Sequence, residues 1–257
     1  MIEGLIRTDF ALVDKREPVS SVAGWLKGEA RDRPLVADRG RPWGILNLRR
    51  LTKSALPARE RLERLAIGTG VVAEDATLEE VARALTDHAV DHMPVGDQRR
   101  AAGYVSALDV ARALGVDGIA ASDALVEVPA LAEDQSMGEA LHHFHEVSVD
   151  ALPVVDARGR VRSILRRRAL FEAGLNRDRA DGRAMPGNPP GVLSGPVRDF
   201  ATDAWEGVRA GAPGGVLLEA LEDWGDAPVV DGEGRLVGMA SPVSLLRAVT
   251  ASGGRSL

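Results

Sequence analysis

The chain has 257 residues, of which 45% are hydrophobic and only 4% aromatic, and its formal net charge is −6. That length is enough for one large core or two of ordinary domain size, and the absence of cysteine excludes disulfides, thiolate metal sites and a cysteine nucleophile. No apolar run approaches the length of a membrane span, and the N-terminus lacks a signal pattern, so we expect a cytoplasmic protein that makes no membrane contact.

A helix followed by two strands is predicted near the N-terminus. Val19, Val22, Ala23 and Leu26 have the i, i+3, i+4, i+7 spacing that lines one helix face. An apolar strand follows at 34–36, and a second strand at 44–46 begins with a small residue. The stretch from Pro57 to Ile67 then predicts a further helix, with leucines on one side and charged residues on the other.

The same helix, strand, turn and strand pattern recurs three more times. Two of the later helices begin with capping boxes, Thr77 with Glu80 and Ser136 with Glu139, in which each side chain satisfies an otherwise unpaired backbone amide. The prolines that mark the first strand of each copy lie 60, 59 and 75 residues apart, and they are Pro34, Pro94, Pro153 and Pro228. Such a period predicts an α/β protein in which one strand-helix-strand-strand-helix unit is used four times.

One irregular segment, 174–196, interrupts the pattern. It contains five glycines and four prolines without helical or alternating periodicity, which predicts a linker. The segment separates the third repeat from the fourth, and we expect the four repeats at about 9–56, 68–115, 124–173 and 197–251.

The sequence of the second copy resembles a CBS domain. The resemblance is carried by the stretch Val71 to Leu114, with Val-Val-Ala-Glu-Asp-Ala-Thr-Leu-Glu-Glu-Val-Ala-Arg-Ala-Leu, then His-Met-Pro-Val, then Gly-Tyr-Val-Ser-Ala-Leu-Asp-Val. Copies three and four fit the same pattern, and copy one fits more loosely. The resemblance implies that the repeats pair through their sheets into two Bateman modules, which form two domains, 1–119 and 120–257. It also implies that an adenosine-containing ligand such as AMP, ATP or S-adenosylmethionine binds between paired repeats.

The family's ligand segment, Ser/Thr-x-x-Asp after the last strand, is kept only in copy two, as Ser106 and Asp109. In the family, the hydroxyl meets a phosphate and the carboxylate accepts both hydroxyls of a ribose, which suits a helix N-terminus and an ionised acid. Copy one has Arg50 in place of the aspartate, and a guanidinium cannot accept those hydrogen bonds.

Further site residues follow from the same resemblance. Arg49 and Arg50 would reach the phosphates of a nucleotide whose ribose lies on Asp109, because a guanidinium fork suits phosphate oxygens. This favours AMP, ADP or ATP over S-adenosylmethionine. Residues expected on the adenine side are Thr69, Val71, His92, Met93 and Pro94, although Val71 and Met93 fit an ordinary core equally well.

Other sites have weaker support in the sequence. Arg166 to Arg168 in copy three, and Ser241 with Ser244 in copy four, would suit a bare phosphate, but we expect the second module to be structural. His88 and His92 stand four apart without a carboxylate or cysteine to complete a metal set, so no metal is predicted.

These features predict a regulatory adenine-nucleotide sensor rather than an enzyme, since no nucleophile motif or phosphate-binding loop is present. Its output would pass to an unidentified protein partner or to another copy of the chain, as in a homodimer. Two alternatives remain open: a ligand-free interaction scaffold, or an S-adenosylmethionine binder. Nucleic-acid binding through the arginine clusters is a third class, which the net charge of −6 argues against.

Overall fold

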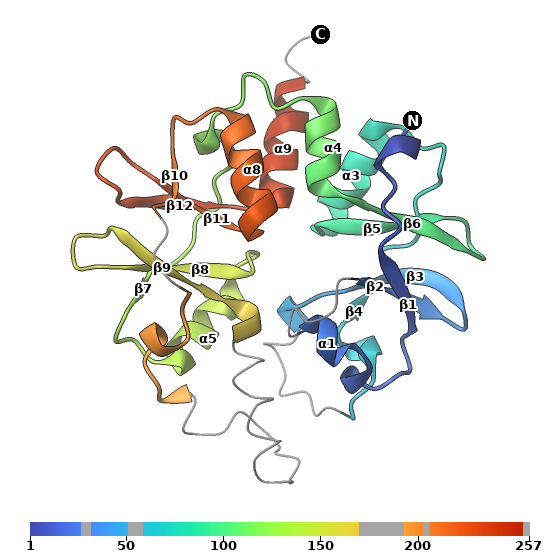
Figure 1. The fold of residues 1–257 in the computed structure, drawn as a ribbon, viewed down its shortest axis with the longest axis horizontal. Coiled ribbons are helices and arrows are strands. Elements are labelled where there is room, and N and C mark those ends of the chain that lie inside the picture. Colours follow the sequence, from blue (N-terminus) through green and yellow to red (C-terminus); the bar gives the residue numbers. More distant parts are fainter. Residues whose placement is uncertain (27–31, 51–58, 170–192, 203–205, 254–257) are drawn as a thin grey trace.

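The strands form four small sheets, one in each predicted repeat (Figure 1). The computed structural model describes residues 1–26, 32–50, 59–169, 193–202 and 206–253. Within those residues, no helix combines the length and the apolar character needed to cross a bilayer. The predicted linker 174–196 lies outside the described residues except for 193–196.

Copy one contains the largest sheet, in the order β1-β2-β3-β4. The predicted helix at 19–26 begins as a 3-10 turn, Val19–Val22, and continues as α1. The bounds of the elements are β1 Phe10–Asp14, α1 Ala23–Leu26, β2 Arg33–Asp38, β3 Arg41–Leu46 and β4 Ala66–Ile67.

The predicted helix from Pro57 to Ile67 is wrong. Pro57 lies outside the described residues, and the described part holds only a 3-10 turn, Leu62–Arg64, followed by strand β4. The backbone of this segment is used in tertiary pairing, since the Val19 amide donates to Glu60 O (2.8 Å) and the Leu62 amide donates to Glu17 O (2.8 Å). Hydrogen bonds to a neighbouring loop thus replace those of a helix.

Copy two contains the two-stranded sheet β5-β6 between helices α3 and α4. The predicted capping box at the start of α3 is confirmed, since the Glu80 amide donates to Thr77 Oγ1 (3.2 Å) and the Thr77 amide donates to Glu80 Oε2 (2.9 Å). The elements are α3 Leu78–His88, β5 His92–Gly96, β6 Ala101–Ser106 and α4 Ala107–Leu114.

Copies three and four each contain a three-stranded sheet in which one parallel and one antiparallel strand flank the centre. The capping box of Ser136 and Glu139 is confirmed at the start of α5. Copy three comprises β7 Leu131–Ala132, α5 Met137–Glu146, β8 Ala151–Val155 and β9 Val161–Arg166. Copy four comprises β10 Val208–Arg209, α8 Gly214–Trp224, β11 Ala227–Val230, β12 Leu236–Ala240 and α9 Pro242–Gly253.

Each repeat is preceded by a segment that crosses to the sheet of its partner. Arg7 bridges Tyr104 of copy two, and Ile67, ahead of copy two, pairs with Ile45 of copy one. Val126 and Met239, and Thr202 and Ile164, repeat the exchange between copies three and four. The exchange pairs copy one with two and copy three with four. It confirms the predicted fold class of four repeats in two modules.

This exchange explains the small residue that opens the last strand of the repeat pattern. A Cβ on Gly44 would lie 1.8 Å from Ile67 O, and one on Gly103 would lie 2.2 Å from Arg7 O. A larger residue would therefore push the crossing segment off the sheet.

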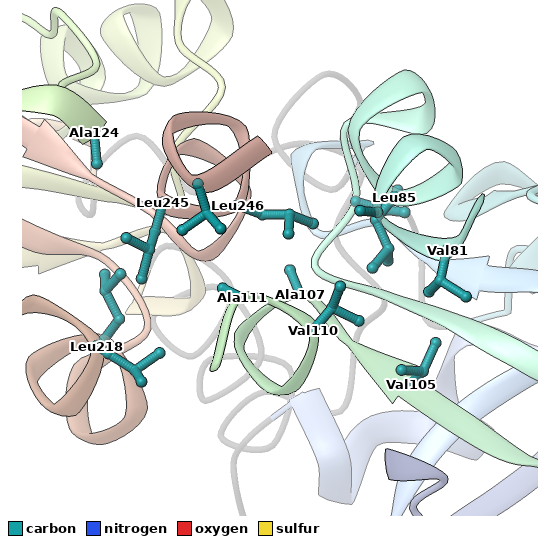
Figure 2. Close-up of a cluster of buried hydrophobic side chains, with 14 of the residues drawn as sticks. Val81, Leu85, Val105, Ala107, Val110, Ala111, Ala124, Leu218, Leu245 and Leu246 are labelled. Carbon is teal, nitrogen blue, oxygen red and sulfur yellow. The ribbon is translucent and has the colours of Figure 1, made fainter. Parts of the chain in front are cut away.

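The two modules join through helices of copies two and four (Figure 1). Figure 2 shows the cluster of side chains at this junction, in which Leu85, Val110 and Ala111 of copy two and Leu245 and Leu246 of copy four are all fully buried. They belong to one apolar cluster that extends from copy two into copy four and includes Leu35 and Ile45 of copy one. Other buried residues of copy one form a second cluster, and copy three forms a third with Met239 of copy four. The largest core therefore spans the predicted domain boundary at residue 119, and that boundary stays a prediction.

Candidate functional site

A cavity of about 400 Å³ is lined by residues from all four repeats. In every copy, its lining includes the first residue of the strand β2, β5, β8 or β11, or the residue directly before it. By sheet register these equivalent residues are Arg33, His92, Ala151 and Asp226. The cavity therefore lies where the four pseudo-equivalent strands converge, and we call it the central cavity.

The register of copy one differs by one residue from the sequence pattern. Leu35, and not Pro34, takes the place of Pro94, because Leu35 pairs with Ile45 as Pro94 pairs with Tyr104. This offset places Arg33 at the position that His92 occupies in copy two.

Arginines dominate the charged lining of the central cavity. Arg49 and Arg168 occupy equivalent positions at the starts of the helices that follow β3 and β9, and Arg33 and Arg166 lie at strand ends. The Arg166 guanidinium donates to Trp224 O (2.6 Å) and lies 5.6 Å from the centroid of that indole ring. Guanidinium groups that converge from several elements suit a ligand with several anionic oxygens.

Carboxylates also line the cavity and pair with some of these positive charges. The Arg33 guanidinium donates to Asp91 Oδ2 (3.2 Å), and His92 Nδ1 lies 2.8 Å from Asp91 Oδ1. Burial lowers the pKa of His92, which leaves the ring neutral. A carboxylate only accepts hydrogen bonds, so the shorter contact, to Asp91, assigns the proton to Nδ1, and the 3.1 Å approach of Arg33 Nη1 to that nitrogen is then not a hydrogen bond. His92 Nε2 is buried and has no hydrogen-bond partner among the described atoms.

Asp226 is a buried aspartate on the side of the central cavity that the second module forms. Its Oδ2 accepts a 2.5 Å hydrogen bond from the Asp150 amide. Burial and the nearby Asp150 carboxylate raise the pKa of Asp226 to about 7. This group is therefore partly protonated near neutral pH, where it adds less negative charge to the cavity than an ordinary aspartate would.

The neighbouring Arg167 has a structural role. Its side chain is 1% exposed, and it donates to Asp150 Oδ1 (2.9 Å), Phe144 O (3.0 Å) and Val149 O (2.7 Å). These bonds tie the start of the copy-three helix to the end of α5. Arg167 therefore stabilises the fold, whereas its neighbours Arg166 and Arg168 line the cavity.

In copy two, Asp109 is paired with an arginine from a distant part of the sequence. Arg7 Nε and Nη2 donate to Asp109 Oδ2 and Oδ1, both at 2.7 Å, and Ser106 Oγ donates to Oδ2 at 2.6 Å. The Asp109 amide donates back to Ser106 Oγ (3.1 Å), so Ser106 is the N-cap of α4. Burial alone would raise the pKa of Asp109, but the hydrogen bonds from Arg7 and Ser106 hold it below its ordinary value.

Comparison with known families identifies the repeat. A family model for the CBS domain matches residues 70–116 and 122–176, which cover most of copies two and three. These two segments are CBS domains. No curated protein matches this chain in sequence.

Two solved structures share the fold over almost the whole chain. MJ1225 from Methanocaldococcus jannaschii, proposed as an archaeal homologue of g-AMPK, has a TM-score of 0.77 at 15% identity over 96% of this chain and 98% of its own. An uncharacterised conserved protein from Pyrococcus horikoshii has a TM-score of 0.64 at 17% identity, over 96% of this chain and 99% of its own. At these identities the likeness shows the fold.

The predicted site residues fall into separate groups. Arg49 and His92 line the central cavity, whereas Ser106 and Asp109 are not among its lining residues. Arg50 points elsewhere, since its Nη1 donates to Ala66 O (2.6 Å). The structure therefore brings Arg49 together with the cavity arginines and not with the carboxylate of copy two.

The residues predicted on the adenine side are also divided. Thr69 and Val71 lie in the segment that crosses to copy one, where the Gly70 amide donates to Trp43 O (3.2 Å). Val71 lines a second hollow beside Trp43, away from the central cavity. Met93 is buried in the core, and Pro94 pairs with Tyr104 in the sheet.

His88 and His92, the pair considered for a metal, do not share a helix face. His88 ends α3, Ala89 adopts a left-handed conformation (φ 51°), and His92 begins β5. In the described part of the chain, no three His, Cys, Asp or Glu side chains are grouped to hold a metal ion.

Sequence reasoning missed four functional candidates, namely Arg7, Arg33, Asp91 and Asp226. Arg33 and Asp226 lie at the same repeat position as His92, but the one-residue offset of copy one hid Arg33. Aligning the copies on their small residues instead of their prolines would have found it. Arg7 lies before the first repeat, and only the strand exchange brings it to Asp109.

Proposed function

We propose that this CBS-domain protein is a regulatory protein that binds an adenine nucleotide with its phosphates in the central cavity. The single observation behind this proposal is the convergence of Arg33, Arg49, Arg166 and Arg168 on that cavity. Charge-assisted bonds from guanidinium groups are among the stronger contacts to phosphate oxygens. Because the arginines come from copies one and three, a bound polyphosphate would connect the two modules.

The size and walls of the central cavity support a small-molecule ligand. Its volume of about 400 Å³ lies in the range of ligand sites in proteins. Trp25 from α1 and Trp224 from α8 are part of its lining and offer aromatic faces on which a base could stack. The preference for adenine rests on the CBS resemblance, and the fold shared with MJ1225, itself proposed as a homologue of g-AMPK, is compatible with a regulatory role.

Isothermal titration of the purified protein with AMP, ADP, ATP and S-adenosylmethionine tests the proposal. We expect binding that strengthens with the number of phosphates, because more oxygens meet the arginines. S-adenosylmethionine, a cation at its sulfur, should bind most weakly. Tight binding of S-adenosylmethionine alone, or no binding of any nucleotide, would overturn the proposal.

One observation favours a second candidate, a ligand-free scaffold that acts only through protein contacts. Asp109, the only family-type carboxylate at its position among the four repeats, is already paired with Arg7. If the titrations show no heat with any of the four ligands, the scaffold would be the better description. Light scattering would then ask whether the partner is a second copy of the chain.

A further inference from the structure

The Arg7–Asp109 pair occurs once among four equivalent positions. The residues that cross at the place of Arg7 are Ile67, Val126 and Thr202 in the other copies. The residues at the place of Asp109 are Arg50, Ala169 and Ser244. The one copy with an acid at this position is therefore the one copy that receives an arginine.

The pair is geometrically complete. Two adjacent nitrogens of Arg7 meet the two oxygens of Asp109 at 2.7 Å, and Ser106 adds a third donor at 2.6 Å. Two vicinal hydroxyls would approach the same carboxylate in the same way, with one donor for each oxygen. Arg7 thus occupies the donor positions that a sugar diol would need.

The backbone of Arg7 is anchored while its side chain is accessible. The Arg7 amide donates to Tyr104 O (2.8 Å), and the Tyr104 amide donates to Arg7 O (3.0 Å). Ile2, five residues earlier, is fully buried in the core that copy two shares with copy four. The Arg7 side chain, however, is 46% exposed, against 11% for Asp109, so the guanidinium can leave without moving the strand.

We propose that Arg7 is a specificity-determining residue that closes Asp109 to ligands carrying a vicinal diol, and that its removal frees this carboxylate to accept such a diol. The inference goes beyond the proposed function, since it concerns a carboxylate outside the central cavity and needs no phosphate. The hydrogen bond to Asp109 raises the pKa of Arg7, so the arginine is charged wherever Asp109 is ionised.

The test is isothermal titration with adenosine and with 2′-deoxyadenosine, which lacks one hydroxyl of the diol. Arg7→Ala should bind adenosine at least ten-fold more tightly than the unaltered protein and should prefer it at least ten-fold over 2′-deoxyadenosine. Adding Asp109→Ala to Arg7→Ala should remove both gains. The matched control is Arg16→Ala, because Arg16 is about as exposed as Arg7 and pairs with a different aspartate, Asp38 (2.6 Å), in copy one.

Three results would overturn the inference: an Arg7→Ala protein that binds adenosine no more tightly, equal affinity for the two nucleosides, or a gain that survives Asp109→Ala. Circular dichroism checks the fold of each variant. If Arg7→Ala does not fold, Arg7→Met replaces it, because methionine keeps an aliphatic side chain but has no hydrogen-bond donor. A gain in adenosine affinity in that variant would support the inference, and no gain would overturn it. Adenosine carries no phosphate, so a failure here is distinct from a failure of ADP to bind the central cavity.

Discussion

Two regions join the repeats of this protein, and they differ in chemistry. Where copies two and four meet, fully buried apolar side chains such as Leu85 and Leu246 pack between helices (Figure 2). Where all four copies meet, arginines and aspartates surround a cavity. Apolar burial stabilises reliably, whereas desolvation offsets much of the attraction between buried charges. The difference suggests that the helix junction holds the modules together and that the central cavity serves binding.

The largest expected effect is on stability, at the apolar junction. Leu246→Ala should lower the free energy of unfolding by about 2–5 kcal/mol, because it leaves a cavity in a packed core. Urea unfolding measures this. The control is Val216→Ala on α8, whose side chain is largely exposed and whose loss should cost less than about 0.5 kcal/mol. Equal costs for the two variants would mean that the junction does not hold the modules.

The second effect is on binding, at the charged junction. Arg49→Ala combined with Arg168→Ala should weaken ADP binding about 10- to 100-fold, because two charge-assisted contacts to phosphate are lost. Isothermal titration checks this. Arg198→Ala, on an exposed side chain outside the cavity, should bind ADP as the unaltered protein does. Unchanged ADP affinity in the double variant would mean that ADP does not bind in the central cavity.

The third effect concerns pH. The pKa of Asp226 is about 7 in the folded protein against an ordinary value of 3.8, so between these values the folded state keeps a proton that the unfolded state releases. Stability from this group therefore falls as pH rises from about 4 to 7, and the loss is complete above pH 7. Asp226→Asn, which still accepts the Asp150 amide through its carbonyl, removes this loss.

Thermal melts of Asp226→Asn and the unaltered protein at several pH values test the sign. The variant should melt higher at pH 8, by about 2–4 °C for each kcal/mol recovered, and the difference should shrink toward pH 4. ADP affinity should also fall between pH 6 and 8 only in the unaltered protein, since ionised Asp226 repels phosphate. A constant difference in melting temperature at all pH values would contradict the titration of Asp226.

The smallest effect is expected at the rim of the helix junction. Arg112 Nη2 donates to Glu222 Oε1 (2.5 Å), but their side chains are 50% and 34% exposed. Such pairs contribute about 0–1 kcal/mol because solvent screens them, so Arg112→Ala should change the unfolding midpoint in urea only slightly. A cost as large as that of Leu246→Ala would mean that charge, and not apolar packing, joins the modules.

Local features of the fold were predictable from the sequence. The capping boxes at Thr77 and Ser136 depend on residues three apart, and both form as expected. The wrong prediction of a helix from Pro57 to Ile67 arises from a contact between distant segments. The leucines of this stretch do face inward, but the backbone bonds to the loop at Glu17, a contact that helical periodicity cannot reveal.

The candidate site was less predictable, because it is made by convergence of distant segments. Arg49 was recognised from its position in the repeat, and it does line the central cavity. Asp226 comes from another module, 177 residues further along the chain, and no local pattern connects the two. The pairing of Asp109 with Arg7 depends likewise on a strand that crosses between repeats.

The sequence by itself determined the repeating unit and its helix starts, because hydrophobic periodicity and capping are short-range effects. The tertiary structure alone decided which charged groups meet. Pseudo-symmetry brings the four equivalent strand starts around one cavity, and the strand exchange places Arg7 on Asp109. Electrostatic interactions depend on the distance between charges in space, and that distance cannot be read from how far apart the residues lie in the sequence.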